Sequence, residues 1–166
     1  LYYEGSIEEI TDRKQAEEEL QRYQEDLEDL INERTYELQE SESRYRTLFD
    51  GVPIGLYRTT PKGKVLDINI AAAVMLGYPI REDALKEKDT AGLYVDPEAR
   101  SSWQEIMEKE GIVHDYELQI RRYDGEVIWL SDSARAVKDE EGQVLYYEGS
   151  LEDITERKNF EEEIHR

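Results

Sequence analysis

Apolar side chains recur at heptad spacing through the first third of the chain. The stretch between Gly5 and Gly51 holds no other glycine and no proline, and it is rich in Glu, Leu, Arg and Gln, which favour helices. Five apolar residues follow the heptad stripe: Leu20, Leu27, Ile31, Leu38 and Tyr45. This pattern predicts one helix from about Thr11 to Phe49, with a seam suited to a partner helix.

The length and polarity of this helix bear on how it is stabilised. It would extend for roughly 55–60 Å, and a single helix of such polarity is marginally stable in water. Gln24, Arg34 and Ser41 also fall on the seam, where polar residues weaken a coiled coil but can set its register and partner. We therefore predict a homodimeric coiled coil, with a lone helix packed on its own domain as the alternative.

The hydrophobic pattern changes to shorter periods after Gly51. The segments typical of strands are two around a turn at Pro61–Gly63, and then 114–122, 127–137 and 143–153. The segments typical of helices are 70–76, 81–89, 97–111 and the stretch from Ile154 onward. This order of elements predicts an α+β fold with one antiparallel sheet.

Alternation along two of these strands predicts an inner face. The residues that share a face are His114, Tyr116, Leu118 and Ile120 on one strand, and Ile128, Leu130, Asp132 and Ala134 on the next. If the second set faces the core, Asp132 is a buried carboxylate that needs a polar partner.

Charge and composition narrow the classes of partner. The formal net charge is −20, so nucleic acid and anionic lipid are poor partners. Cysteine is absent, which excludes disulfides, thiolate metal sites and cysteine nucleophiles, and no apolar run is long enough to span a membrane. These features fit a cytoplasmic protein with one core of about 100 residues.

Groups suited to catalysis are sparse. His114 and His165 are the only imidazoles, and the sequence around His165 lacks the following residues that mark a phosphoacceptor helix. Asp96 and Glu98 suit a turn and a helix cap better than acid–base chemistry. We expect no catalytic residues and no metal site in this chain.

The chain repeats a segment at a long interval. LYYEGSIEEITDRK begins at Leu1 and LYYEGSLEDITERK begins at Leu145, and residues 1–20 match residues 145–164 at fourteen of twenty positions. Such a repeat indicates tandem units of one kind. A chance or engineered duplication is the alternative.

Several stretches between about Tyr45 and Lys158 resemble a PAS domain with its C-terminal PAC motif. They are IGLYRTTPKGKVLDINIAAAVMLGY, LYVDPEAR, RRYDGEVIWLSDSARAVKDEEGQV and the triplet Asp153-Ile154-Thr155 followed by Glu156-Arg157-Lys158. The resemblance implies a five-stranded antiparallel sheet with flanking helices, used as a sensor or dimerisation module in signalling proteins. Ile70 departs from the family, which often has proline there, and is conservative for the fold.

The resemblance also implies a division of the chain. Residues 1–10 would be the orphan last strand of a preceding PAS domain, 11–44 a helical linker, 45–157 the PAS/PAC domain, and 158–166 the start of a C-terminal signalling helix. The parent would be a tandem-PAS protein, such as a sensor histidine kinase or a diguanylate cyclase, with neighbouring PAS and output domains as partners. Without its sheet, the orphan strand could fray, continue the helix or add to an exposed sheet edge of another molecule, and we expect fraying or irregular packing.

Two sites follow from the resemblance. Asp153, Ile154 and Thr155 would form a signal relay, because Asp or Thr can fix a helix start and Ile154 can anchor the joint. A ligand pocket would lie between the inner face of the sheet and the helices. Its candidate lining is Tyr57, Met75, Trp103, Met107, Tyr116, Leu118, Ile128, Leu130 and Asp132. The alternative is a core that these side chains simply fill.

The cysteine and histidine content of the chain limits which cofactors of PAS domains it could bind. A covalent flavin needs a cysteine, and a haem commonly uses a histidine on the long helix, whereas residues 97–110 contain none. A non-covalent flavin, near Trp103 or Trp129, or a small organic ligand stays open. Two functions therefore compete: a sensory module that detects a small molecule or relays a signal to an output domain, and a ligand-free spacer that dimerises and relays.

Overall fold

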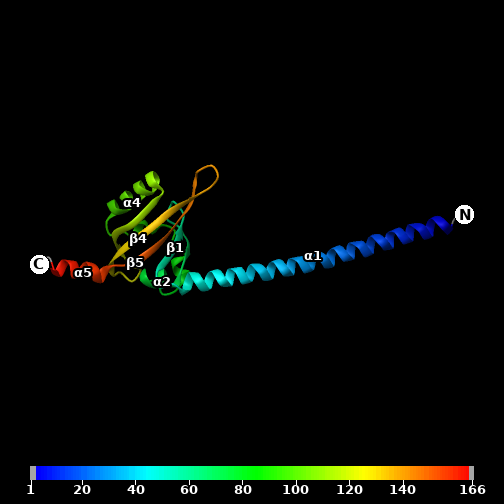
Figure 1. The fold of residues 1–166 in the computed structure, drawn as a ribbon, viewed down its shortest axis with the longest axis horizontal. Helices are drawn as coiled ribbons and strands as arrows, with labels where there is room; N and C mark the ends of the chain where they lie inside the picture. Colours follow the sequence, from blue (N-terminus) through cyan, green and yellow to red (C-terminus); the bar gives the residue numbers. More distant parts are fainter. Residues whose placement is uncertain (1–2, 165–166) are drawn as a thin grey trace. The chain divides into compact units, whose positions relative to one another are not determined.

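A computed structural model describes residues 3–164, and these divide into two compact units that meet in sequence at Thr47 and Leu48. The first unit is helical. The second is a mixed domain of strands and helices (Figure 1). None of the helices in the described part of the chain has the length and apolar character that crossing a membrane requires. The expectations for Leu1, Tyr2, His165 and Arg166 lie outside the described residues.

The first unit belongs to α1 (Tyr3–Gly51), which is longer than the predicted helix. Residues 3–10, expected to fray or pack irregularly, are instead the first turns of this helix. This segment forms a helix because a strand without a sheet leaves its backbone N–H and C=O groups unpaired, whereas a helix pairs them within the segment. The five seam residues are between 38% and 69% exposed, so their apolar surface is uncovered in the single chain.

The second unit is built on a five-stranded antiparallel sheet in the order β2-β1-β5-β4-β3. Its strands are β1 (Gly55–Thr59), β2 (Val65–Ile68), β3 (Ile112–Arg121), β4 (Val127–Lys138) and β5 (Val144–Asp153). The last strand lies in the middle of the sheet. It therefore joins the opening hairpin to the two long strands that precede it in the chain, and the end of the chain is part of the fold's centre.

Short helices connect β2 to β3 and one helix leaves the sheet. They are α2 (Ile70–Met75), α3 (Arg81–Ala84), the 3-10 turn η1 (Thr90–Leu93), α4 (Pro97–Glu110) and the exit helix α5 (Thr155–Ile164). α2 contacts β1 and α4 contacts β3 (Figure 1). The side chain of Asp96 caps α4 by accepting from Glu98 N, and Gly111 ends it with φ of 71°, as predicted for a helix cap and a terminating glycine.

Asn69 ties the start of the domain together. Its Nδ2 donates to the carbonyls of Phe49 (2.8 Å) and Ile54 (2.9 Å), and its Oδ1 accepts from Leu56 N (2.8 Å) and Ala72 N (2.9 Å). The residue is fully buried, and both donors and both lone pairs of its amide are used. One side chain thus connects the end of α1, the start of β1 and the first turn of α2.

Alternation predicts the inner face of β4 correctly but fails at the start of β3. Ile128, Leu130, Asp132 and Ala134 are all buried. On β3, however, His114 is exposed and Val113 is buried, because the register shifts between Val113 and Tyr116. Asp115 accommodates this bulge with φ of 47°, a region that Asp tolerates better than most residues, and its N–H donates to Ser133 Oγ at 2.9 Å.

Candidate functional site

A cavity of about 80 Å³ lies between the inner face of the sheet and the segments that cover it. Its lining is Tyr57, Thr59, Val65, Ile68, Leu76, Thr90, Leu93, Tyr94, Arg100, Trp103, Leu118, Ile120, Leu130, Asp132 and Leu151. Most of these side chains are apolar. Since a water molecule needs about 10–15 Å³ of such space, the cavity could hold a handful of waters or one small organic molecule.

A hydrogen bond across the sheet defines the polar end of this cavity. Tyr57 Oη on β1 donates toward the carboxylate of Asp132 on β4, at 3.0 Å from Oδ1 and 3.1 Å from Oδ2. The central strand β5 lies between these two strands. The phenol therefore spans a whole strand on the inner face, and this requires a small residue beneath it.

Gly149 on β5 is that small residue. It pairs with Tyr57 on one side and with Ala134 on the other. A Cβ at this position would lie 2.8 Å from Tyr57 Oη and 2.8 Å from the carbonyl oxygen of Ser133. The missing side chain of Gly149 leaves the space through which Tyr57 reaches Asp132.

Burial sets the proton affinity of both partners. Burial raises the pKa of Asp132 from 3.8 to about 7. The hydrogen bond that Tyr57 donates and the nearby indole of Trp103 act in the opposite direction and offset part of this rise. Burial, and then the charge of Asp132, raise the pKa of Tyr57 well above its ordinary value, so its hydroxyl keeps its proton and acts as donor. None of the groups that shift the pKa of Asp132 is cationic, so its charge has no buried counter-ion there.

Trp103 brings a second polar atom to the same end of the cavity. The side chain is 3% exposed and lies on α4, with its ring edge-on to Tyr147 at 5.2 Å between centroids. Its indole N–H lies close enough to Asp132 to lower the pKa of that carboxyl, yet it makes no hydrogen bond of acceptable geometry with any described residue. It is a buried donor without an acceptor.

A further polar group lies along the cavity wall. Arg100 Nη1 donates to Thr90 Oγ1 at 3.1 Å, and its guanidinium carbon is 5.4 Å from the centre of the Tyr94 ring. Burial and the charge of Asp132 raise the pKa of Tyr94 to about 12. Arg100 thus places a positive charge at the wall, and its contact with Thr90 joins α4 to η1.

The structure brings five of the nine predicted pocket residues to the cavity: Tyr57, Trp103, Leu118, Leu130 and Asp132. The other four lie elsewhere in the core. Met75 packs at the edge of the larger core cluster while its neighbour Leu76 lines the cavity, and Ile128 is buried in that same cluster. Met107 is buried one turn beyond Trp103, against Val113. Tyr116 Oη donates to Ala99 O at 2.9 Å and lies outside the lining.

Two lining residues that pattern reasoning missed carry chemistry. Arg100 lies three residues before Trp103 on α4, a spacing that puts both on one face of a helix, and this could have been found. Tyr94 follows η1 and reaches the sheet by an isolated bridge to Ile120. No local pattern in the sequence predicts that bridge.

The exit junction is formed by the predicted triplet and one residue of β4. Ile154 N donates to Trp129 O at 2.9 Å, and Thr155 Oγ1 accepts from Trp129 N at 3.0 Å. Asp153 Oδ1 accepts from Thr155 N at 2.9 Å, and Ile154 is buried. Both backbone groups of Trp129 are therefore held by the first residues of the exit helix.

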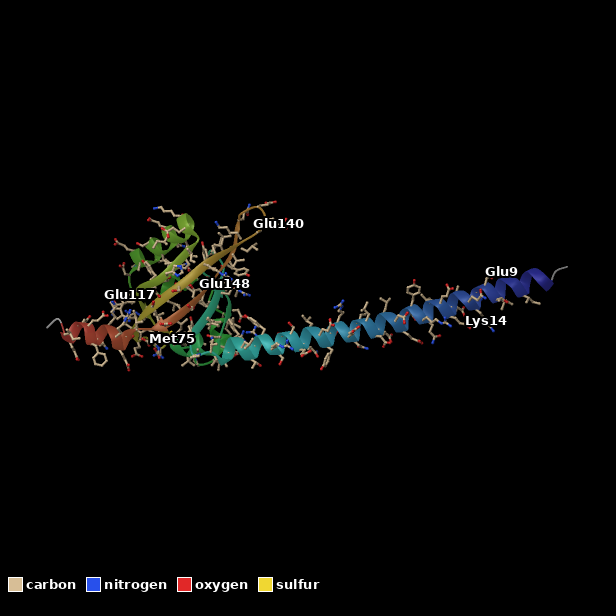
Figure 2. The ribbon with its side chains drawn as sticks, in the orientation of Figure 1. Glu9, Lys14, Met75, Glu117, Glu140 and Glu148 are labelled. Carbon is tan, nitrogen blue, oxygen red and sulfur yellow. The ribbon has the colours of Figure 1, made fainter. Side chains whose placement is uncertain are left out.

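Charged side chains add a second connection between α5 and the sheet. Arg157 Nη2 contacts Glu117 Oε1 at 2.5 Å, and Lys158 Nζ forms an ion pair with the same carboxylate. Figure 2 shows Glu117 on β3 beside the start of α5. The hydrogen bond that Lys158 donates to Glu117 lowers the pKa of Glu117 and raises the pKa of Lys158. The Lys158 ammonium also lies 5.3 Å from the centre of the Trp129 ring.

Among residues 3–164, no three or more His, Asp or Glu side chains are grouped so that they could hold a metal ion. The polar groups of the cavity instead suit hydrogen bonding to an organic molecule. They are the carboxylate of Asp132, the indole N–H of Trp103, the guanidinium of Arg100, the phenols of Tyr57 and Tyr94, and the hydroxyls of Thr59 and Thr90.

Comparison with known proteins agrees with this fold. The probable diguanylate cyclase DgcE of Escherichia coli (strain K12) is 26% identical in an alignment of 136 residues that covers 75% of this chain but only 11% of that protein. A PAS domain from Colwellia psychrerythraea superposes with a TM-score of 0.59 at 23% identity, over 69% of this chain and 97% of that one. A PAS domain from a two-component sensor histidine kinase gives 0.57 at 20% identity, over 69% and 98%.

The chain thus shares its fold with solved PAS domains. The family model described as PAS domain matches residues 51–156, which cover the whole sheet and the start of the exit helix. The chain belongs to the PAS domain family, whose members are sensory and signal-transduction modules.

Proposed function

We propose that this PAS module detects a small organic molecule in its cavity and passes the event to an output domain through α5. One observation carries the proposal. Asp132, 3% exposed, lies on the cavity wall with Tyr57 as a neutral partner and an unpartnered indole donor nearby. Burying a carboxylate without a cationic partner is costly, and this cost favours a role in binding over simple filling of the core.

The route from cavity to exit runs along two paired strands. Asp132 pairs with Leu151, and both line the cavity, while two residues further along Leu130 pairs with Asp153 of the exit triplet. A shift of β4 against β5 at the cavity therefore acts directly on the residues that hold the start of α5. This supports a relay in which α1 brings a signal in and α5 carries one out.

A test of ligand detection compares the small molecules that copurify with the chain and with two variants. Leu118→Phe adds bulk to the cavity wall, whereas Leu66→Phe adds the same bulk at a 42% exposed position outside the lining. Native mass spectrometry should show an extra mass on the wild type and on Leu66→Phe that is absent from Leu118→Phe. If no variant carries an added mass, and none gains one after incubation with a metabolite extract, the ligand-free spacer is favoured.

That second function, a dimerising spacer, has its own observation. The seam residues of α1 carry apolar side chains that are 38% to 69% exposed in the single chain, which a parallel partner helix would cover. A homodimer and a ligand sensor are compatible. The spacer alone becomes the better account only if the cavity stays empty.

We also propose that the parent protein holds tandem PAS domains. The segment YYEGS recurs at Tyr2 and Tyr146, so Gly5 takes the place of Gly149, where this domain has no room for a side chain. Glycine is a poor helix residue, which suits a segment that is a central strand in its parent. Residues 1–10 would then end a preceding PAS domain, and 11–44 would link it to this one.

We propose an output domain of one of two kinds for the parent protein. The chain spans 11% of the length of the cyclase it resembles, so a diguanylate cyclase or a histidine kinase output is a proposal from similarity. We propose no catalytic role for the described residues themselves, and a cytoplasmic location for the module.

A further inference from the structure

The polar end of the cavity offers one donor and one acceptor that are not satisfied by each other. Trp103 Nε1–H is buried and lacks an acceptor among the described residues. Asp132 accepts from Tyr57, but a carboxylate has about four lone-pair positions, so acceptor capacity remains. A group that fits here must therefore accept from the indole and donate to the carboxylate.

The rest of the lining limits what can be attached to such a group. Leu76, Leu93, Leu118, Leu130 and Leu151 contribute apolar surface to the cavity. Water placed against these side chains would lack hydrogen-bond partners, so a cavity of about 80 Å³ is poorly filled by water alone. An apolar portion of a few carbon atoms suits it better.

Neither a cationic nor an anionic ligand suits the polar end of the cavity. A cation would neutralise Asp132, but an ammonium group has no lone pair for Trp103, and Arg100 lies on the same wall. An anion would accept from Trp103 and approach Arg100, but it would also meet the carboxylate of Asp132. A neutral group with both a donor and an acceptor satisfies every polar atom at this end.

We propose that the ligand is a small neutral molecule with a hydroxyl group, which accepts from Trp103 Nε1–H and donates to Asp132 while its carbon skeleton contacts the leucine side chains of the cavity. This inference rests on the proposed ligand-sensing function and names its ligand class. It assigns Trp103 and Asp132 as binding residues, Tyr57 as the residue that positions the carboxylate, and Leu118 and Leu130 as contacts for the skeleton.

The experiment uses four probes of matched shape: 2-propanol, acetone, isopropylammonium and acetate. They present a donor and an acceptor, an acceptor alone, a cationic donor, and an anion. The readout is the indole N–H resonance of Trp103 in a ¹H–¹⁵N spectrum of the full chain at pH 8, where Asp132 is ionised. Trp129 is the only other tryptophan, lies outside the cavity lining, and serves as an internal reference.

The hydroxyl probe should shift the Trp103 resonance downfield in a saturable way, with a dissociation constant of about 0.1–10 mM, as expected for so small a ligand. Acetone should bind at least about tenfold more weakly, because it leaves the carboxylate without a donor. The two charged probes should bind more weakly still. The Trp129 resonance should not move.

Two variants test the assigned residues. Trp103→Phe should weaken the binding of 2-propanol at least about tenfold. Because this variant lacks the indole, its binding is measured by the methyl resonances of Leu118 and Leu130. Asp132→Leu removes the acceptor for the hydroxyl proton and should likewise weaken the binding of 2-propanol at least about tenfold. A folded spectrum of each variant is checked first, and if Trp103→Phe does not fold, the probe series on the wild type still decides.

The outcomes separate this inference from the proposed function. If acetone, isopropylammonium or acetate binds as tightly as 2-propanol or more tightly, the cavity binds ligands but the hydroxyl assignment is wrong. If no probe shifts the Trp103 resonance at up to about 50 mM, well above the expected dissociation constants, both the assignment and ligand detection by this cavity are overturned.

Discussion

Tyr57 Oη lies 3.0 Å and 3.1 Å from the two carboxylate oxygens of Asp132, although 75 residues separate them in the chain. The contact passes over Gly149 on the strand between them. It gives a buried carboxylate one neutral donor and leaves room for a second. The stability and the proposed chemistry of the cavity both depend on this pair.

Tyr57→Phe should destabilise the domain by about 1.5–3 kcal/mol at pH 8, because it removes a hydrogen bond to a buried charge. Tyr116→Phe is the matched control, since its hydroxyl donates to the neutral carbonyl of Ala99 and should cost about 0.5–1.5 kcal/mol. Urea unfolding gives both values. Equal losses in the two variants would show that Asp132 is not charged in the folded state at that pH.

Asp132→Asn should change how stability depends on pH. The folded pKa of Asp132 is raised to about 7 from 3.8, so between these values the folded state holds a proton that the unfolded chain releases. The free energy of unfolding of the wild type should therefore fall as pH rises through this window, by up to about 4 kcal/mol, and level off above it. Asp132→Asn has no carboxyl group to titrate at this position. Its free energy of unfolding relative to that of the wild type should therefore increase from pH 4 to pH 7.

Glu148→Gln is the control with the opposite sign. The hydrogen bond from Arg135 lowers the pKa of Glu148, so its stabilisation is present at neutral pH and is lost as pH falls through the folded pKa. Urea titrations at several pH values measure both variants. A constant difference between Asp132→Asn and wild type across pH 4–8 would contradict a raised pKa.

Gly149→Ala should destabilise the domain by about 1–3 kcal/mol or more, because the new methyl group meets backbone as well as the Tyr57 hydroxyl. Gly92→Ala is the control, since nothing lies within 4 Å of a Cβ there. Thermal unfolding compares the two. A neutral Gly149→Ala would mean that β5 can move away from Tyr57 at little cost.

Thr155→Val should loosen the exit junction without unfolding the sheet. It removes the acceptor for Trp129 N, so the amide of Trp129 should exchange with solvent at least about tenfold faster. Thr47→Val, which loses only a bond to Ser43 O within α1, should leave that amide unchanged. Unchanged exchange in Thr155→Val would exclude this hydroxyl as a connection between β4 and α5.

Leu27→Lys combined with Ile31→Lys should abolish dimerisation, because two lysine side chains would face their copies across the seam. Tyr36→Lys introduces one lysine on another face of the helix, where the side chain is 68% exposed, and should leave the dimer intact. Sedimentation velocity measures the mass of each. A monomeric wild type would contradict the coiled coil directly.

Local patterns in the sequence determined most of the elements. The period of two along β4 placed Ile128, Leu130, Asp132 and Ala134 on one face, because alternation is a property of the strand itself, and all four are buried. Asp96 and Gly111 marked the two ends of α4, because caps are satisfied by neighbours in the chain. The exit triplet was found through the family resemblance and makes the helix-start bonds expected of it.

Only the tertiary structure decided which of these residues meet. The bulge at Asp115 reverses the face of His114, and its partner Ser133 comes from another strand. Met75 was predicted in the pocket, but the rotation of α2 presents Leu76 instead. The packing of α4 and η1 against the sheet decides two further features. They are the bridge from Tyr94 to Ile120 and the unpartnered donor of Trp103. Periodicity reports the face of one element, whereas these contacts depend on the order and register of several, which no single segment encodes.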